Sequence, residues 1–281
     1  LKVAKSINFF EKVNIFCHFK GGGGKGMRIA HNKEELKSGF QSAKNEAQKS
    51  FGDDRVFIEK FIVGPRHIEI QILADEFGNM VYLGERECSV QRRHQKVIEE
   101  SPSSLVDEAM RKEMGEQALR LAKAVNYSSA GTVEFVASND KSFYFLEMNT
   151  RLQVEHPVTE LVTGIDLVEK MINISAKKPL GLTQSDIKMN GWSVEARIYA
   201  EDPIRNFAPS IGRLKTFKSP NENSSSIRLD SGVQEGGEIS MYYDPMIAKL
   251  ISYGQDRNDA CLKLSSALAV SYTHLTLPTK A

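Results

Sequence analysis

The sequence predicts a mixed α/β fold of the α+β class, and three observations lead to that expectation. The chain of 281 residues has the length of roughly two domains at about 150 residues each. Helical and strand-like periodicities alternate up to about Pro179, and short strand-like runs between Gly, Pro and Asn turns follow it. Hydrophobic residues make up 41% and charged residues 26%, which is typical of a globular chain rather than a disordered one.

Each element follows from a local pattern of residues. Apolar residues at helical spacing, with an aspartate in the N-cap position of the second, predict three helices, over residues 33–50, 107–125 and 166–175. Runs rich in β-branched and aromatic residues predict strands at Val56–Val63, Arg66–Ala74, Thr132–Ala137, Phe143–Met148, Trp192–Ala200, Ile227–Ser231 and Met246–Tyr253. In Arg66–Ala74 three isoleucines alternate with His67, Glu69 and Gln71, so this strand is expected to bury one face only.

The composition excludes several classes of protein. The 37 Lys and Arg residues nearly balance the 36 Asp and Glu residues, which argues against a nucleic-acid binder held by bulk charge. No apolar run approaches the roughly 18 residues that a membrane span needs. The three cysteines, Cys17, Cys88 and Cys261, lie far apart, which excludes a disulfide scaffold or a CxxC metal site and indicates a reducing compartment.

The segment Gly21–Gly26 has the composition of a phosphate-binding loop, since glycines allow close approach of backbone N–H groups and Lys25 adds a charge. It is not a Walker A loop, because Gly26 stands where Ser or Thr should follow the lysine. The spacing formally matches GxGxxG, but that fingerprint opens a helix and Met27–Ala30 is predicted to be a strand. A flexible lid over a nucleotide and a plain flexible linker both stay open.

Two glutamates, Glu134 and Glu147, are expected to face each other across a hairpin if its loop is 139–142. Like charges directly opposite are destabilising, so one interpretation is a hard cation such as Mg²⁺ between them, with Asn149 as a further oxygen ligand. A three-residue loop would place the two glutamates on opposite faces, and they would then be solvated strand residues.

Two polar runs are further candidates for a binding site. In the run 147–156, alternation places Arg151, Gln153 and Glu155 on the face of Glu147, where an arginine can bind a small planar anion and a glutamate can act as base. A surface ion pair is the alternative. The run 91–96 carries three fixed cations and is interpreted either as an anion patch or as a solvated loop.

Seven stretches occur in an order that resembles the biotin carboxylase module, an ATP-grasp enzyme, and they cover about residues 21–270. The stretches are GGGGKGMRIA, EKFIVGPRHIEIQIL, ERECSVQRRHQKVIEESPS, AGTVEF, FLEMNTRLQVEHPVTE, EARIYAEDP and YYDPMIAKL. Residues 189–192, 209–214 and 242–245 most resemble the alpha subunits of propionyl-CoA carboxylases. The resemblance implies an ATP-grasp fold with a glycine-rich lid, followed by a mostly β biotin carboxylase C-terminal domain.

The resemblance also implies a ligase that carboxylates biotin with bicarbonate and ATP through carboxyphosphate, using Mg²⁺ or Mn²⁺ and biotin on a carrier domain. The implied ATP-binding residues are Gly21, Gly22, Gly23, Gly24, Lys25, Gly26, Glu59, Lys60, His67, Gln91 and His94. The implied metal ligands are Glu134, Glu147 and Asn149. The implied bicarbonate and biotin pocket consists of Lys96, Arg151, Gln153, Val154, Arg197 and Asp244, with Glu155 as general base and with Lys96, Arg151 and Arg197 also counted as catalytic.

The implied partners are a biotin carrier domain and a beta-type carboxyltransferase subunit, in an oligomer of the mitochondrial matrix, with no nucleic acid or membrane. Both ends depart from the family pattern, so 1–20 and 271–281 are predicted to be non-native sequence. Between them we expect a partial lid subdomain at 21–62, a catalytic ATP-grasp subdomain at 63–190 and the C-terminal domain at 191–270. The chain is therefore predicted to be a fragment. An inactive or poorly folded fragment and another ATP-grasp ligase are the alternative interpretations.

Overall fold

The computed structural model describes residues 13–17, 28–222 and 226–275, with side chains for 28–222 and 226–271 apart from residues 51, 59 and 60. It divides into two compact units, one of residues 1–65 with 92–95 and one of residues 66–91 with 96–281. The predicted non-native ends contribute two strands to these units, at 13–17 and at 272–275. The predicted division of the chain into five parts stays a prediction.

The smaller unit is a three-stranded antiparallel sheet covered by one helix. The strands run in the order β2 (Arg28–Ala30), β1 (Val13–Cys17) and β3 (Val56–Lys60). Helix α1 (Lys33–Phe51) begins where the side chain of Asn32 accepts a hydrogen bond from the backbone of Glu35. Its buried face carries Leu36, Ala43 and Ala47 at helical spacing, and that face packs against the sheet. The helix predicted over 33–50 is confirmed.

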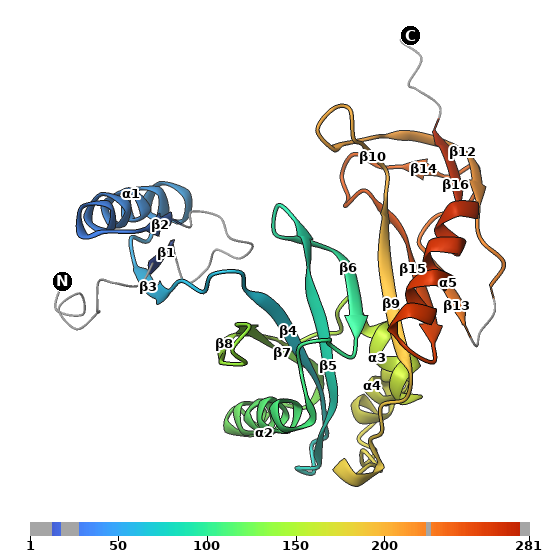
Figure 1. The fold of residues 1–281 in the computed structure, drawn as a ribbon, viewed down its shortest axis with the longest axis horizontal. Coiled ribbons are helices and arrows are strands. Elements are labelled where there is room, and N and C mark those ends of the chain that lie inside the picture. The colour runs from blue at the N-terminus through green and yellow to red at the C-terminus, as the bar shows by residue number, and fades with distance from the viewer. Residues whose placement is uncertain (1–12, 18–27, 223–225, 276–281) are drawn as a thin grey trace. The chain divides into compact units, whose positions relative to one another are not determined.

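The larger unit is built on one eight-stranded antiparallel sheet (Figure 1). Its strands follow in the order β13 (Ile227–Ser231), β15 (Met246–Gly254), β9 (Trp192–Tyr199), β6 (Gln95–Ser101), β5 (Met80–Arg92), β4 (Arg66–Ala74), β7 (Ser129–Ala137) and β8 (Phe143–Asn149). The strands predicted around 66–74, 132–137, 143–148, 192–200, 227–231 and 246–253 are all present. β5 and β6 were not predicted.

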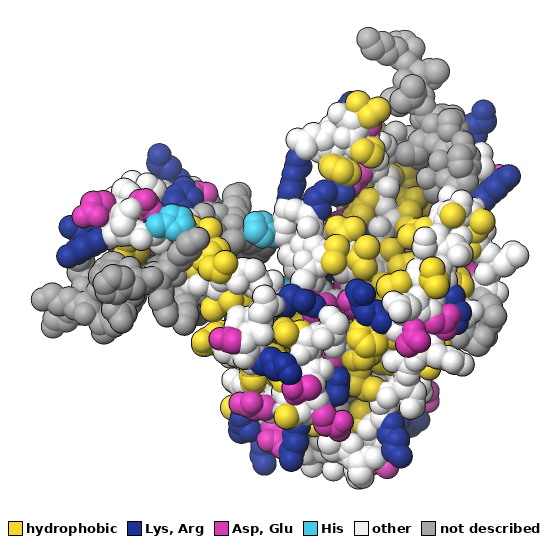
Figure 2. All heavy atoms as spheres, in the orientation of Figure 1, with side chains coloured by type: hydrophobic (Ala, Val, Ile, Leu, Met, Phe, Trp, Pro, Cys, Tyr) yellow, Lys and Arg dark blue, Asp and Glu magenta, His cyan; other side chains and the backbone are white. Residues whose placement is uncertain are grey.

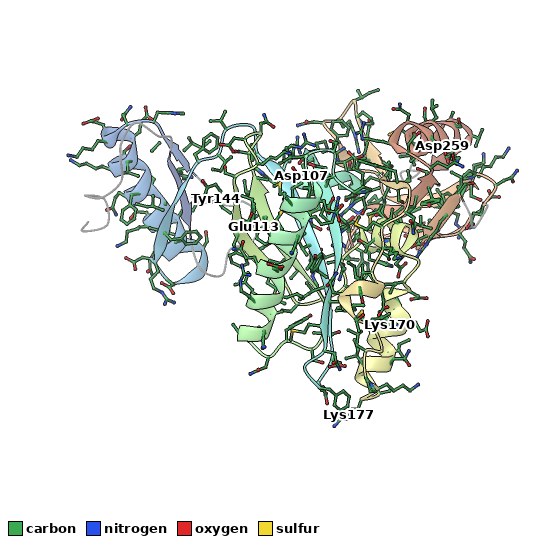
Figure 3. The ribbon with its side chains drawn as sticks, turned by 60° about the horizontal axis from the view of Figure 1, so that its bottom comes forward. Asp107, Glu113, Tyr144, Lys170, Lys177 and Asp259 are labelled. Carbon is green, nitrogen blue, oxygen red and sulfur yellow. The ribbon has the colours of Figure 1, made fainter. Side chains whose placement is uncertain are left out.

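Helices cover the apolar sides of these strands. Helix α2 (Glu108–Ala124) begins at Asp107, whose Oδ1 accepts from the Met110 N–H at 2.9 Å, and it packs on the isoleucines of β4 (Figure 3). Helix α5 (Arg257–Val270) packs in the same way on β9 and β15. Helix α4 (Leu167–Ser175) begins at Asp166 and packs beside β5 and β7. The predicted N-cap at Asp107 and the helix at 166–175 are confirmed.

Shorter elements complete the unit. They are α3 (His156–Thr163), the 3₁₀ turn Gln184–Asp186, β10 (Glu201–Asp202), β11 (Ala208–Pro209), β12 (Gly212–Lys218), β14 (Glu238–Ile239) and β16 (Tyr272–Leu275). Strands β10 and β11 pair with each other, and β14, β12 and β16 form a separate three-stranded sheet. Among the described residues, none of the helices has the length and hydropathy of a membrane span. Figure 2 shows cationic and anionic side chains interspersed over α2, in keeping with the near-neutral charge.

One expectation about β4 is wrong. The isoleucines Ile68, Ile70 and Ile72 are buried as predicted, but Glu69 and Gln71 on the opposite side are also fully buried. The polar side of β4 is covered by side chains of neighbouring strands and by α3, and these supply hydrogen bonds in place of water. The alternation of apolar and polar residues in β4 therefore indicates one apolar and one polar buried side, and not one side exposed to solvent.

Candidate functional site

The centre of the polar side of the large sheet is the ammonium group of Lys96, on β6. It contacts three carboxylates: Glu69 on β4, Glu134 on β7 at 3.2 Å and Glu155 before α3 at 2.7 Å. All three carboxylates are almost completely buried. Burial opposes the charge on Lys96, but the three anions outweigh it and raise the pKa of the ammonium group above its ordinary value. The predicted residues Lys96, Glu134 and Glu155 are thus brought together.

The carboxylate of Glu155 is held by a second cation, Arg197 on β9. Arg197 Nη2 donates to Glu155 Oε2 at 2.9 Å, while its Nε donates to Glu99 on β6 at 2.6 Å. Glu155 occupies the N-cap position of α3, where its side chain makes no hydrogen bond to the helix backbone. Because Pro157 follows in the first turn, the helix needs fewer capped N–H groups, and the carboxylate is free to lie between Lys96 and Arg197.

His67, on β4, lies at the edge of this cluster. Its Nε2 is 3.1 Å from Glu134 and 3.2 Å from Glu69, although neither contact has the alignment of a hydrogen bond. Its Nδ1 lies 3.3 Å from the amide nitrogen of Gln91. Burial disfavours the imidazolium, but the two carboxylates outweigh burial and raise the pKa of His67 to about 9. The predicted ATP-binding residues His67 and Gln91 therefore lie side by side, next to the predicted metal ligand Glu134.

A bulge in β5 brings Arg86 into the same cluster. The register between β4 and β5 shifts by one residue near Gly84, whose φ of +82° is readily adopted by glycine. After the shift Arg86 lies directly opposite Glu69. The guanidinium is completely buried and donates to Glu69 at 3.0 Å and to the side-chain oxygen of Gln153 at 2.8 Å. It also donates to Gln71, Thr132 and Thr159.

The predicted pairing of Glu134 with Glu147 is confirmed, since the two residues are direct partners of β7 and β8. Asn149 donates to Glu134 Oε1 at 2.8 Å, and Gln153 donates to the same oxygen at 2.9 Å. Two facing carboxylates with an amide beside them form a donor set that suits a hard divalent cation such as Mg²⁺. Ligand atoms of His67, Glu69 and Glu134 also lie within 4.8 Å of one another. The residues present therefore fit a cation at Glu134.

Not all of the predicted pocket converges on Lys96. Strand β8 ends at Asn149, so the expected alternation through 151, 153 and 155 is wrong. Gln153 and Glu155 are buried, whereas Arg151 is exposed and donates to the backbone oxygen of Leu152 at 3.3 Å. A loop without strand geometry gives its side chains no period of two. The proposed role of Arg151 stays a prediction.

The remaining predicted residues lie elsewhere. The carbonyl oxygen of Val154 accepts a hydrogen bond from Lys249 on β15. Asp244 is exposed in the turn before β15, and its charge acts on Tyr199 of β9. His94 is exposed in the turn between β5 and β6, which belongs to the smaller unit. Residues Gly21, Gly22, Gly23, Gly24, Lys25 and Gly26 and the side chains of Glu59 and Lys60 lie outside the described residues.

Several residues of the cluster were missed by sequence reasoning. They are Glu69, Arg86, Glu99, Glu195 and Lys249. Glu195 lies directly opposite Glu99, and both of its carboxylate oxygens, like Oε2 of Glu99, have no hydrogen-bond partner among the described residues. Burial raises the pKa of Glu99 to about 7, and Glu155 adds to the rise while Arg197 opposes it. The available signal was the density of charged residues in short stretches such as Glu85-Arg86-Glu87.

Comparisons with known families match nearly the whole chain. Residues 3–183 match the model of the carbamoyl-phosphate synthase L chain, ATP binding domain, and residues 195–274 match the biotin carboxylase C-terminal domain. The first match begins at residue 3, within the segment 1–20 that was predicted to be non-native sequence.

Curated relatives include propionyl-CoA carboxylase alpha chains. The protein of Ruegeria pomeroyi is 60% identical over 266 residues, which are 88% of this chain and 39% of the relative. The mitochondrial protein of Homo sapiens is 59% identical over 95% of this chain and 36% of the relative. The chain thus spans less than two fifths of the length of these relatives.

Solved structures that are similar along almost the entire chain include two biotin carboxylases. The biotin carboxylase domain of Hydrogenobacter thermophilus 2-oxoglutarate carboxylase, in complex with MgADP, ADP and bicarbonate, is 44% identical with a TM-score of 0.89, over 98% of this chain and 59% of that one. The biotin carboxylase of Campylobacter jejuni, in complex with β,γ-ATP, is also 44% identical with a TM-score of 0.87, over 94% of this chain and 58% of that one. The predicted fold class is confirmed by these similarities.

Proposed function

Because this chain belongs to the biotin carboxylase family, with an ATP-binding domain followed by a biotin carboxylase C-terminal domain, we propose that it carries the site for ATP-dependent carboxylation of biotin by bicarbonate. The observation that carries the proposal is the buried carboxylate of Glu155 between the ammonium of Lys96 and the guanidinium of Arg197. The carboxylate of Glu155 can accept a proton, and Lys96 and Arg197 can hold an anion beside it.

The proposed role of Glu155 is to remove the proton of bicarbonate. Bicarbonate is a weak nucleophile, so a positioned base accelerates its attack on a phosphoryl group. Lys96 and Arg197 reach Glu155 from β6 and β9, and each can exchange part of its contact with the carboxylate for a contact with the bound anion. Gln153, whose side-chain oxygen accepts from Arg86, donates its amide to Glu134, which also contacts Lys96.

The proposed metal ligands are Glu134, Glu147 and Asn149, which would hold Mg²⁺ or Mn²⁺. The cation, when bound, draws negative charge from the phosphate oxygens of ATP. His67 and Gln91 lie beside Glu134 and are proposed to contact the nucleotide. The same proposal assigns nucleotide contacts to Glu59, Lys60, His94 and the glycine loop.

Arg197 is proposed to stabilise the oxygen of biotin that becomes negative when the ring nitrogen loses its proton. Its Nε is fixed by Glu99 at 2.6 Å, so the guanidinium is already oriented before a ligand arrives. Asp244, in the turn near Tyr199, is proposed to lie at the biotin end of the site. Arg151 is proposed to join the bicarbonate pocket.

The relatives support a finer proposal for the whole protein. We propose the first half-reaction of a propionyl-CoA carboxylase, with a biotin carrier domain and a beta-type carboxyltransferase subunit as partners. The named relatives from animals are described as mitochondrial, which supports a mitochondrial matrix location, while a bacterial relative is equally similar.

The test follows one oxygen atom. If bicarbonate attacks the terminal phosphorus of ATP and the product then splits into CO₂ and phosphate, one oxygen of bicarbonate stays on phosphate. The chain, with Mg-ATP and ¹⁸O-labelled bicarbonate, is therefore expected to release phosphate carrying one ¹⁸O, and free biotin is expected to increase the rate.

Two variants make this result specific. Glu155→Gln is expected to lower the rate by about 10²-fold or more, the usual loss for a missing general base. Glu100→Gln is the matched control, because Glu100 is also an ion-paired glutamate of this sheet but contacts Arg257 and Trp192 instead. Labelled phosphate whose rate is indifferent to biotin would favour another ATP-grasp ligase. Unlabelled phosphate, or none, would overturn the proposal for this chain.

A further inference from the structure

The loop between β8 and α3 carries the three adjacent residues Gln153, Val154 and Glu155, and each is held by a different strand. Arg86 on β5 holds the side chain of Gln153 at 2.8 Å, and Arg197 on β9 holds that of Glu155 at 2.9 Å. Val154 is held through its backbone, because its carbonyl oxygen accepts a hydrogen bond from the ammonium of Lys249. The loop has no regular secondary structure of its own, so these contacts set its conformation.

Lys249 is placed for this contact by the sheet. It lies on β15 directly opposite Arg197 on β9, so the two cations share one side of the sheet. They contact consecutive residues of the loop, one through a carboxylate and one through a carbonyl. Both come from the stretch that matches the biotin carboxylase C-terminal domain, whereas the loop lies in the stretch that matches the ATP-binding domain.

A chain of ion pairs fixes the ammonium group of Lys249. Asp230 on β13 is its direct partner in the ladder and lies 3.3 Å from Nζ. Arg228 donates to both oxygens of Asp230, at 2.7 Å and 2.9 Å, and also to Glu160 of α3 at 2.8 Å. The side chain of Lys249 is only 11% exposed. A lysine held on two sides in this way is built into the protein rather than free to bind a ligand.

We propose that Lys249 is a positioning residue, which fixes the Val154 carbonyl and thereby keeps Glu155 between Lys96 and Arg197. The importance of Lys249 for catalysis rests on the proposed function, in which Glu155 is the base and the loop lines the bicarbonate pocket. The hold on the loop itself does not depend on that function. The C-terminal domain thus contributes to the bicarbonate pocket through the side chain of Lys249 as well as through that of Arg197.

The experiment compares hydrogen exchange in the loop between variants of the full chain. Lys249→Met keeps the length of the side chain and removes its donors. We expect amide exchange in the peptide covering 150–158 to rise about tenfold, as for the loss of one charge-assisted hydrogen bond, while exchange in α2 stays unchanged. Lys249→Arg, which keeps charge and donors, is expected to restore most of the protection.

Lys263 provides a matched control within the same domain. Like Lys249, it donates to a backbone carbonyl, that of Tyr253 at 3.2 Å, and to a carboxylate, that of Asp259 at 2.8 Å. Lys263→Met is expected to leave exchange in the loop unchanged. Faster exchange spread over all peptides of Lys249→Met, or unchanged exchange in its loop, would show a merely structural lysine and would overturn the proposal.

A second variant covers the case in which Lys249→Met does not fold. Asp230→Asn leaves Lys249 in place and removes the carboxylate that orients it, so a smaller rise confined to the same peptide is expected. No rise there would again contradict the proposal. In the ¹⁸O assay, Lys249→Met is expected to raise the KM for bicarbonate more than the KM for ATP. An inactive wild-type chain would end the proposed function, while the exchange data would still decide the role of Lys249.

Discussion

The two sides of strand β4 are equally closed to solvent and are built from opposite chemistry. On one side Ile68, Ile70 and Ile72 pack against α2. On the other side Glu69 and Gln71 contact Arg86, and Glu69 also contacts Lys96. Apolar contacts are non-directional and tolerate changes of shape, whereas each buried polar group needs a particular partner. The apolar side therefore tolerates the loss of a contact more readily, whereas the polar side depends on each partner and holds the geometry of the site.

The largest effect on stability is expected on the polar side, from Arg86→Met. The substitution leaves Glu69 buried with one cation fewer. It also removes the guanidinium that donates hydrogen bonds to five buried side chains. Breaking a buried ion pair in this way costs about 3–5 kcal/mol in the free energy of unfolding, which urea denaturation measures. Adding Glu69→Gln to the variant is expected to recover part of the loss. If Arg86→Met lowered the free energy of unfolding by less than about 1 kcal/mol, the buried polar groups of β4 would not depend on Arg86 as a partner.

A somewhat smaller effect is expected on the apolar side, from Ile70→Ala. Ile70 is fully buried against α2, so the substitution loses apolar burial and leaves a cavity, at a cost of about 3 kcal/mol. Ile172→Ala is the control, because Ile172 is 65% exposed and its loss is expected to cost under about 0.5 kcal/mol. Unlike Arg86→Met, Ile70→Ala is expected to leave the catalytic pH profile unchanged. A shifted profile would show that the two sides are not separable.

A third prediction concerns pH and the facing carboxyls of Glu99 and Glu195. Burial raises the pKa of Glu99 from 4.5 to about 7 and raises that of Glu195 well above its ordinary value. The folded state then holds protons that the unfolded state has released, so stability falls as pH rises from about 4.5 through about 7. Glu99→Gln is expected to flatten the slope between pH 5 and 7, and Glu99→Gln/Glu195→Gln to flatten it further. An unchanged slope in both would exclude this pair as its source.

The smallest effect is expected far from both sides of β4, at the start of α4. Asp166 accepts a hydrogen bond from the Glu169 N–H at 2.8 Å, and Asp166→Ala is expected to cost about 1 kcal/mol. Asp166→Asn keeps the acceptor and is expected to be nearly neutral. Thermal unfolding of the two variants separates the cap from a general effect of charge, since an equal loss in both would point to charge.

Local patterns were enough to predict many elements of the fold. The strands at Arg66–Ala74 and Ile227–Ser231 agree with the structure at both ends, and α2 begins at the predicted Asp107 cap. These elements follow from period and capping, which depend on neighbours in sequence. The long strands β5 and β6 were missed because their glutamates and arginines, buried in the sheet, have the composition of a surface loop.

The candidate site was less predictable because it depends on register. Glu134 does face Glu147, but not through the expected four-residue loop. Ala137 pairs with Phe143, which leaves a five-residue loop, and a bulge beside Glu134 then restores the pairing. Arg86 likewise faces Glu69 only after the bulge near Gly84. Neither bulge can be recognised from local sequence, and the roles of Arg86 and Lys249 depend on partners more than 60 residues away, such as Gln153 and Val154.

The pairing of β6 with β9 has a consequence for gene rearrangement. It joins the two family domains within one sheet, with Glu99 opposite Glu195 and with Arg197 reaching back to Glu155. The two domains are therefore not interchangeable modules. In a hybrid chain with its junction between 184 and 194, the buried charged residues that meet between the two domains would come from two different proteins. Each domain could then be replaced only together with the acids and cations that contact it in the other domain.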